Sequence, residues 1–232
     1  MIFRQLFDAD SSTYTYLIAD PQTGDAALID PVLEQVERDL RVLRELDLTL
    51  SHVLETHVHA DHVTASGVLR EKTGCTVVAG ELGAQCADVQ VGEGDEIRVG
   101  SLRVQVLATP GHTDDSLSFV VGDRVFTGDA LLIRGTGRTD FQNGEPGQLY
   151  DSITRKLFRL PETTRVFPGH DYKGWTESTI GEERRHNPRI AGKDREQFIE
   201  LMNGLELGMP KRIDVAVPAN RACGIVPPRM EV

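Results

Sequence analysis

The chain has 232 residues, of which 39% are hydrophobic and 26% charged, so it is long enough for one large domain with a hydrophobic core. Its formal net charge of −11 argues against nucleic acid as a partner, because binding a phosphate backbone requires a basic surface. No apolar run approaches the roughly 20 residues that cross a bilayer, and the N-terminus lacks the basic and apolar stretches of a secretory signal.

The chain contains three cysteines, Cys75, Cys86 and Cys223. Their number is odd and they lack C-x-x-C spacing, which argues against a disulfide framework and against a zinc ribbon. We therefore expect unpaired thiols and a reducing, cytoplasmic location. Cys75 adjoins a short apolar stretch and is expected in the core.

The first part of the chain alternates short apolar runs with amphipathic stretches. Runs rich in β-branched and aromatic residues predict strands, and apolar residues at helical spacing predict helices. The predicted elements are, in order, a hairpin of strands 13–18 and 26–29, a helix over 31–46, a strand over 50–56, a helix over 63–72 and a strand over 76–79.

The second part begins with a predicted meander and ends in charged helices. The predicted elements are strands 97–99, 102–107, 117–121 and 124–127, a helix over 148–160, a strand over 165–167, helices over 177–185 and 193–204, and an ordered loop from Met209 onward. Two β-rich halves flanked by helices predict an α/β/β/α sandwich.

The stretch His57-Val58-His59-Ala60-Asp61-His62 follows a predicted strand and precedes a predicted helix. Residues two apart in extended chain point to the same side, so His57 and His59 can face one point. Three further candidate ligands also follow predicted strands: His112, Asp129 and His170. Because strand ends can converge at one edge of a sandwich, this set predicts a metal site, with neighbouring glycines permitting the tight turns.

The residues alone leave the number and kind of metal ions open. The full set would hold two zinc ions that activate water, with His57, His59 and His112 on one ion, Asp61, His62 and His170 on the other, and Asp129 bridging. A smaller set of two histidines and one carboxylate is typical of non-haem Fe(II), with the remaining residues hydrogen-bonding around it. The two other histidines, His52 and His186, are expected to be structural.

The order of these motifs resembles the metallo-β-lactamase superfamily over about residues 13–172. Three further stretches are similar to the persulfide dioxygenase family: the sequences G-R-T-D-F-Q-N-G at 137–144, G-H-D-Y-K-G at 169–174 and P-A-N-R-A-C-G at 218–224. Glyoxalase II shares the metal motif but differs over 138–144 and has a larger C-terminal helical domain.

The resemblance implies an α/β fold of the metallo-β-lactamase αββα type, as one domain over 1–232 in which about 176–232 form a short helical and loop extension. It implies a dioxygenase that uses one Fe(II) per chain, O2 and water to convert glutathione persulfide into sulfite and glutathione. The partners implied are these small molecules, without nucleic acid or membrane, and a homodimer is compatible with the resemblance.

The resemblance also assigns roles by motif position. The implied iron ligands are His57, His112 and Asp129. The residues implied to surround them and hydrogen-bond to ligands and water are His59, Asp61, His62 and His170. Substrate contacts are implied for Arg138, Tyr172 and, through the matching tail, Cys223. A planar guanidinium at position 138 suits a glutathione carboxylate, since it can form two parallel hydrogen bonds.

Two other functions remain as alternatives. A dinuclear zinc thioester hydrolase of the glyoxalase II type would use the same fold and ligand set without O2. A metal-binding or sulfur-carrier module without catalysis is the third, although such a carrier has no need of an open ligand set beside an arginine. Metal content and O2 uptake separate the three.

Overall fold

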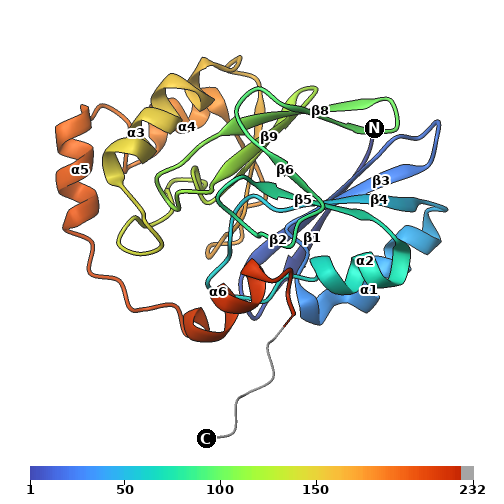
Figure 1. The fold of residues 1–232 in the computed structure, drawn as a ribbon. Helices are drawn as coiled ribbons and strands as arrows, with labels where there is room; N and C mark the ends of the chain where they lie inside the picture. The colour runs from blue at the N-terminus through green and yellow to red at the C-terminus, as the bar shows by residue number, and fades with distance from the viewer. Residues whose placement is uncertain (226–232) are drawn as a thin grey trace, which may run out of the picture.

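A computed structural model describes residues 1–225 and contains two facing six-stranded sheets with helices on the outside (Figure 1). In spatial order, the first sheet contains β1 (Ile2–Asp8), β2 (Thr13–Ala19), β3 (Asp25–Ile29), β4 (Thr49–Leu54), β5 (Thr76–Gly80) and β6 (Val89–Val91). The second contains β12 (Ser178–Thr179), β11 (Arg165–Pro168), β10 (Arg124–Gly128), β9 (Leu117–Val121), β8 (Leu102–Ala108) and β7 (Glu96–Val99).

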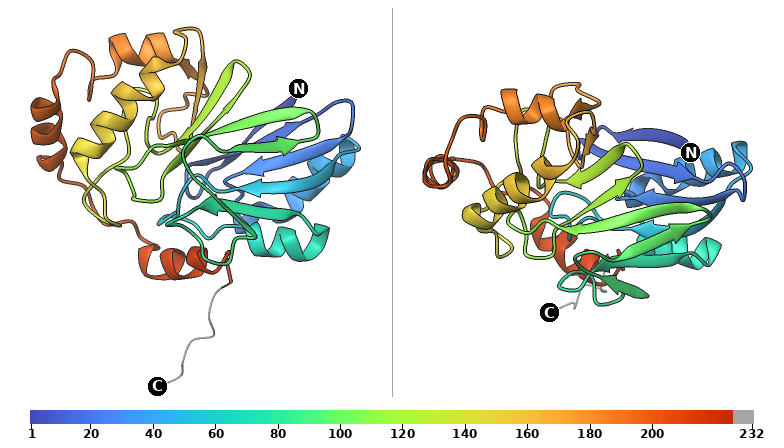
Figure 2. Two further views of the ribbon diagram at one scale, coloured as in Figure 1. Left: turned by 45° about the horizontal axis from the view of Figure 1, so that its top comes forward. Right: turned by 90° about the horizontal axis from the view of Figure 1, so that it is seen from above.

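The helices lie in groups on the two outer faces. The first group contains η1 (Leu33–Gln35), α1 (Val36–Glu45) and α2 (Ser66–Thr73). The second contains α3 (Pro146–Arg155), η2 (Leu157–Arg159), α4 (Ile180–His186) and α5 (Arg195–Asn203), and a last helix, α6 (Ile213–Arg221), follows an irregular stretch. Figure 2 shows α3, α4 and α5 on the side of the molecule opposite α1 and α2.

The burial of β2 explains why two layers can pack on one sheet. All seven of its residues are buried, and successive side chains of a strand point to opposite faces. Tyr16 and Ile18 therefore pack into the core between the two sheets, whereas Leu17 and Ala19 pack beneath α1 and α2. A separate core joins the second sheet to α3 and α5 through residues such as Phe198. These three apolar cores lie between the four layers of an α/β/β/α sandwich, which confirms the predicted fold class.

The structure differs from the predicted elements in several segments, among them the short strands β6 and β12, which were not predicted. Strand β1 was not predicted, because its side chains are mostly half-buried at a sheet edge and do not alternate clearly. The predicted helix over 148–160 is two shorter ones, α3 and η2. The stretch from Met209 forms α6 rather than only a loop, although Pro218 lies inside it; the end of that stretch, 226–232, lies outside the described residues.

Among residues 1–225, no helix has the length and apolar character needed to cross a membrane. This agrees with the absence of a long apolar run in the sequence.

Asp39, on the buried face of α1, makes stability depend on pH. Its side chain is fully buried and one carboxyl oxygen has no partner among the described residues, while the other accepts from Arg38 Nε at 2.8 Å. Burial raises its pKa from 3.8 to about 6, so the native state binds the proton more tightly than the unfolded chain. The contribution of Asp39 to stability therefore falls as the pH rises from about 4 through 6.

We expect Asp39→Asn to stabilise the protein at pH 7.5 by about 1–2 kcal/mol and to have little effect at pH 4. Urea denaturation at both pH values measures this, with the exposed Glu45→Gln of the same helix as the matched control. Equal effects of Asp39→Asn at the two pH values would contradict the expectation.

Candidate metal centre

The predicted ligands lie at one edge of the sandwich because four strands end there. Strands β10 and β11 are parallel neighbours, so Asp129 and His170 follow them at the same edge. The segment after β4 reaches the second sheet through Leu117 N–H, which donates to Thr56 O at 2.7 Å. The start of β2 contacts the end of β11, where Tyr14 N–H donates to the carbonyl of residue 169 at 2.8 Å.

Two glycines allow the backbone to approach the ligands. A Cβ on Gly137 would lie 2.6 Å from Nδ1 of His112, and one on Gly169 would lie 2.7 Å from Oδ1 of Asp129. Real Cβ atoms essentially never make contacts this short, so larger residues at these positions would displace the ligands.

His57, His112 and Asp129 form one group whose potential ligand atoms lie within 4.8 Å of one another. Nδ1 of His112 bonds to the carbonyl of Arg138 at 2.6 Å, and Nδ1 of His57 lies 2.9 Å from Oγ1 of Thr56. These contacts leave Nε2 of each ring for a metal, and Nε2 of His112 is 3.7 Å from Oδ2 of Asp129. Two imidazoles and one carboxylate fit a non-haem Fe(II) site.

A second group contains His59, Asp61, His62 and His170. His170 uses both ring nitrogens, Nδ1 toward Oδ1 of Asp129 at 2.7 Å and Nε2 toward Oδ2 of Asp61 at 2.9 Å. Nδ1 of His62 bonds to the same Asp61 oxygen at 2.8 Å. His170, Asp61 and His62 thus form a hydrogen-bonded network that holds Asp129 in place.

Some nitrogens of the second group remain without a hydrogen bond. Nε2 of His62 and both ring nitrogens of His59 are buried and have no such partner among the residues described. Nε2 of His59 does lie 3.2 Å from Oδ1 of Asp30. These donor atoms would also fit a second metal ion, so the geometry accommodates both metal stoichiometries.

Charges in the network are complementary. Burial by itself would raise the pKa of the Asp129 carboxyl, but the neighbouring His170 outweighs burial and holds that pKa well below its usual range. Burial would likewise lower the pKa of His170, yet Asp129 and Asp61 hold it well above its usual range. The two carboxylates therefore favour the protonated form of His170, which lies between them.

A cavity of about 690 Å³ opens onto both groups, a size suited to a small organic ligand. His57, His112 and Asp129 line it, and so do Arg138 and Tyr172. Sequence reasoning missed further cations that line it: Arg134, Lys173, Arg189, Lys211 and Arg212. They come from four separate segments, and no local motif groups them.

Arg138 and Tyr172 lie at this cavity in different environments. The Arg138 guanidinium is paired with both carboxylate oxygens of Asp140 at 2.6 Å and donates to the carbonyls of Gly208 at 2.5 Å and Leu207 at 3.2 Å. Tyr172 is 71% exposed, and its ring stacks parallel to that of His170 with centroids 6.1 Å apart.

The structure does not bring Cys223 to the cavity. It is buried and forms a disulfide with Cys86, so the prediction of unpaired cysteines and no disulfide was wrong for this pair. Only Cys75 is a free, buried thiol among the described residues. The partners are 137 residues apart, and folding alone brings them together. The expectation of a reducing compartment rested on unpaired cysteines, so the structure no longer supports it.

Comparisons with known proteins identify the family and the fold of the chain. A family model described as the metallo-beta-lactamase superfamily matches residues 9–85 and 87–170. The mitochondrial persulfide dioxygenase ETHE1 of Mus musculus is 48% identical over 231 residues, covering 98% of this chain and 91% of the relative. The crystal structure of ETHE1 from Myxococcus xanthus has 70% sequence identity and a TM-score of 0.96, covering 97% of this chain and 100% of that one.

A hydrolase is also similar, over a shorter stretch. The hydroxyacylglutathione hydrolase of Bradyrhizobium sp. (strain BTAi1) is 39% identical over 178 residues, covering 72% of this chain and 66% of the relative. The shared fold thus extends to relatives named for hydrolysis, some of which cover 97–98% of the chain at 29–34% identity. The relatives named for persulfide oxidation cover 98% of it at a higher identity, 46–48%.

Proposed function

Because this chain belongs to the persulfide dioxygenase family within the metallo-β-lactamase superfamily, we propose that it oxidises glutathione persulfide with one Fe(II) held by His57, His112 and Asp129. The reaction converts one glutathione persulfide, one O2 and one water into glutathione and sulfurous acid, which ionises to sulfite. The terminal sulfur gives up four electrons, and O2 accepts them.

The observation that supports this proposal best is the difference in hydrogen bonding between the two groups of histidine and aspartate residues. His57 and His112 each have Nε2 free for a metal, whereas His170 has both ring nitrogens bonded to carboxylates. A three-residue site results, and Fe(II) bound there would supply open coordination positions for O2 and the persulfide sulfur.

The residues around the proposed metal site orient its ligands and bind the substrate. His170 fixes one oxygen of Asp129, which leaves the other for the metal. The carbonyl of Arg138 fixes the His112 ring, so the same residue that lines the cavity also orients a ligand. The cavity would hold the persulfide beside His57, His112 and Asp129. The reacting groups would then be as close to one another as in an intramolecular reaction.

We further propose that Arg138 and Tyr172 contact the glutathione part of the substrate. Both line the cavity, and the exposed Tyr172 ring offers an apolar face with a polar tip. Arg138 has a second task, since it joins the segment at Leu207 and Gly208 to the cavity wall. Glutathione carries two carboxylates, and cations along the cavity suit them.

Arg138→Ala is expected to raise KM for the persulfide about tenfold and to lower kcat much less, because it removes a binding contact rather than a reacting group. Steady-state O2 uptake measures both constants. Asp140→Asn separates the two roles of Arg138. It removes the carboxylate that pairs with the guanidinium, while the bonds to the carbonyls of Leu207 and Gly208 still hold the side chain at the cavity wall. An unchanged or lower KM in Asp140→Asn supports a substrate contact, whereas a KM raised as in Arg138→Ala indicates a structural role only.

The experiment that tests the function is metal analysis of the purified protein combined with O2 uptake on addition of glutathione persulfide. About one iron per chain, with O2 consumed and sulfite released in equal amounts, is the expected result. No O2 uptake by iron-loaded protein would overturn the proposal.

A dinuclear zinc thioester hydrolase is the second candidate. The unbonded nitrogens of His59 and His62 favour it, because they suit a second metal ion. This candidate predicts about two zinc ions per chain and hydrolysis of S-lactoylglutathione without O2.

A further inference from the structure

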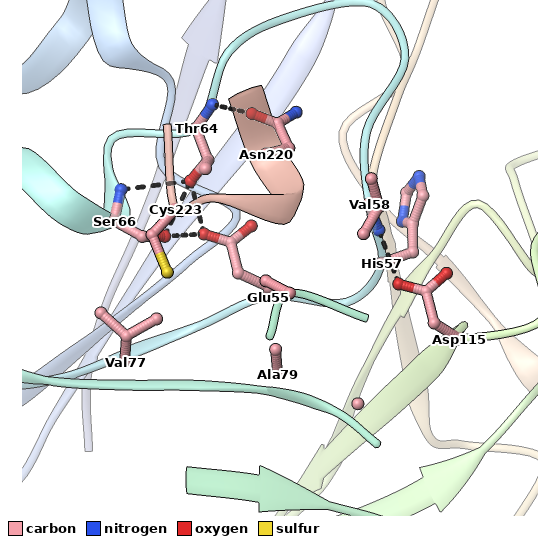
Figure 3. Close-up of a pocket in the computed structure, with 12 residues that line it drawn as sticks. Glu55, His57, Val58, Thr64, Ser66, Val77, Ala79, Asp115, Asn220 and Cys223 are labelled. Atoms are coloured by element: carbon pink, nitrogen blue, oxygen red, sulfur yellow. Dashed lines mark hydrogen bonds between the residues drawn. The ribbon is translucent and has the colours of Figure 1, made fainter. Parts of the chain in front are cut away.

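Asn220, on α6, is bonded to the backbone of the segment that carries the clustered histidines. We call residues 57–64 the metal loop. The Asn220 amide donates to the carbonyls of His59 at 2.9 Å and His62 at 2.8 Å, and its oxygen accepts from Thr64 N–H at 2.8 Å. Asn220 is 3% exposed, so all three bonds are shielded from water. Figure 3 shows the bond between Thr64 and Asn220. One side chain thus fixes three points of the metal loop.

The backbone after α6 is pressed against the same region. The carbonyl of Cys223 accepts from Gly67 N–H at 2.8 Å, at the start of α2. A Cβ on Gly224 would lie 2.1 Å from the carbonyl oxygen of Thr64, so the two segments touch. The position of the metal loop therefore depends on where the end of α6 lies.

Few apolar contacts hold α6 itself. Its buried apolar residues are only Ala216 and Ala219, which pack with Val63. The preceding segment, 204–212, is irregular, and Val215 is 50% exposed. Burial of two alanines contributes little, because the hydrophobic effect scales with the apolar area removed from water.

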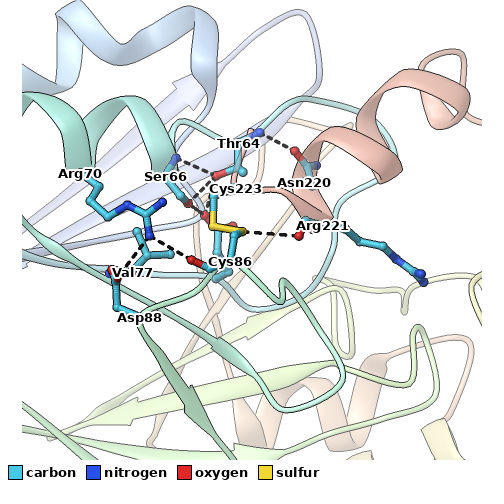
Figure 4. Close-up of a disulfide and its surroundings, with 10 residues drawn as sticks. Thr64, Ser66, Arg70, Val77, Cys86, Asp88, Asn220, Arg221 and Cys223 are labelled. Atoms are coloured by element: carbon cyan, nitrogen blue, oxygen red, sulfur yellow. Dashed lines mark hydrogen bonds and ion pairs between the residues drawn. A yellow bond between two sulfur atoms is a disulfide. The ribbon is translucent and has the colours of Figure 1, made fainter. Parts of the chain in front are cut away.

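The Cys86–Cys223 disulfide supplies a covalent attachment (Figure 4). Cys86 lies between β5 and β6, and its carbonyl accepts from Arg70 Nη1 at 2.9 Å, which also pairs with Asp88 at 3.0 Å. The disulfide thus joins the end of α6 to the edge of the first sheet. Cys223 is the third residue after Asn220, so the attachment acts close to the contacts with the metal loop.

We propose that Asn220 is a positioning residue for the metal loop, and that the Cys86–Cys223 disulfide holds it there under the control of low-molecular-weight thiols. The inference rests on the proposed metal centre. Reduction would release the end of α6 and loosen the metal loop, which lowers iron retention and turnover. Glutathione, a product of the proposed reaction, belongs to the class of thiols that carries out this reduction.

The exchange starts at Cys86, because that residue is partly exposed and Cys223 is buried. A thiolate attacks Cys86 Sγ and forms a mixed disulfide, and the Cys86–Cys223 bond breaks with Cys223 leaving as a thiolate. A second thiol then attacks the mixed disulfide. In total, two thiols are oxidised to one small disulfide, and two protein thiols form.

Amide hydrogen exchange tests the disulfide step on the full chain as purified, before and after treatment with glutathione. We expect exchange at Thr64 and Gly67 to become at least about tenfold faster on reduction, since both amides donate to the end of α6. Cys86→Ser should show the fast exchange without treatment, and Cys75→Ala should behave as the unaltered protein. Identical exchange in the oxidised and reduced protein would overturn the proposal, as would unpaired Cys86 and Cys223 in protein purified without reductant.

Substitution at position 220 tests the positioning role. Asn220→Ala should speed iron dissociation about tenfold or more and lower kcat with KM nearly unchanged, because Asn220 does not line the substrate cavity. Asn220→Asp keeps the acceptor for Thr64 and should have a smaller effect, which also provides a variant if Asn220→Ala does not fold. Arg221→Ala, an exposed neighbour, is the matched control.

Two results would contradict the positioning role: iron retention like that of the control in both Asn220 variants, or a fall in melting temperature that alone accounts for the lost activity. Hydrogen exchange is read without turnover. An inactive protein with the expected exchange pattern would therefore reject the proposed function and leave the control of the metal loop standing.

Discussion

Asp129→Ala is expected to yield a folded protein without bound iron and without O2 uptake. Asp129 is the single carboxylate of the three-residue group, and its side chain contacts both His170 and His112. Its removal leaves two imidazoles for the metal, too few for a stable Fe(II) site. His57→Ala should give the same loss, because it leaves one imidazole and one carboxylate.

Iron content by elemental analysis and O2 uptake by electrode measure the outcome. Asp123→Ala, in the turn before β10, is the matched control, since Asp123 is an exposed aspartate in the same hairpin. A variant of Asp129 or His57 that keeps full iron and the full rate would refute the ligand assignment. Circular dichroism confirms that loss of iron is not loss of fold.

His170→Ala is expected to lower iron affinity about 10–100-fold while one iron per chain still binds at saturation. His170 holds one oxygen of Asp129 and one of Asp61, so its loss frees Asp129 to rotate and leaves the two carboxylates without their shared hydrogen-bond partner. His170→Asn should restore part of the affinity, because an amide nitrogen can replace Nδ1 as the donor to Asp129.

The same variant discriminates between the two metal stoichiometries. Titration with iron and with zinc, followed by elemental analysis, gives the number of ions that bind. If His170 is itself a ligand in a pair of ions, His170→Ala loses about one of two. If it orients Asp129, the number stays at one and only the affinity falls.

The sequence predicted those parts of the fold that depend on local patterns. The alternating β2 strand and the helix before β4 follow from apolar periodicity, and the ligands follow from histidine and aspartate placed just after strands. Strand β1 has no such signal because its exposure changes irregularly along an edge. Helix α6 contains Pro218, which locally favours a loop, and its contacts through Asn220 stabilise it in the fold.

The sequence predicted candidate ligands that the fold does bring together, but it did not predict what surrounds them. Nothing in the sequence shows that Cys86 and Cys223 meet, because their pairing depends on contacts across the whole chain. Likewise the motif that contains Arg138 does not show that Asp140, two residues later, occupies its guanidinium. Short motifs indicate which side chains the chemistry needs. Which of these side chains pair with one another depends on the folded structure.

The division of the ligands between two sheets sets an order of events during synthesis. The metal loop follows β4 of the first sheet, whereas Asp129 and His170 follow strands of the second. A chain emerges from the ribosome N-terminus first, so the histidine-rich loop exists long before its carboxylate. Binding of a metal ion by the full set of candidate ligands is therefore a late step of maturation, and until the second half arrives the nascent first sheet exposes its inner apolar face.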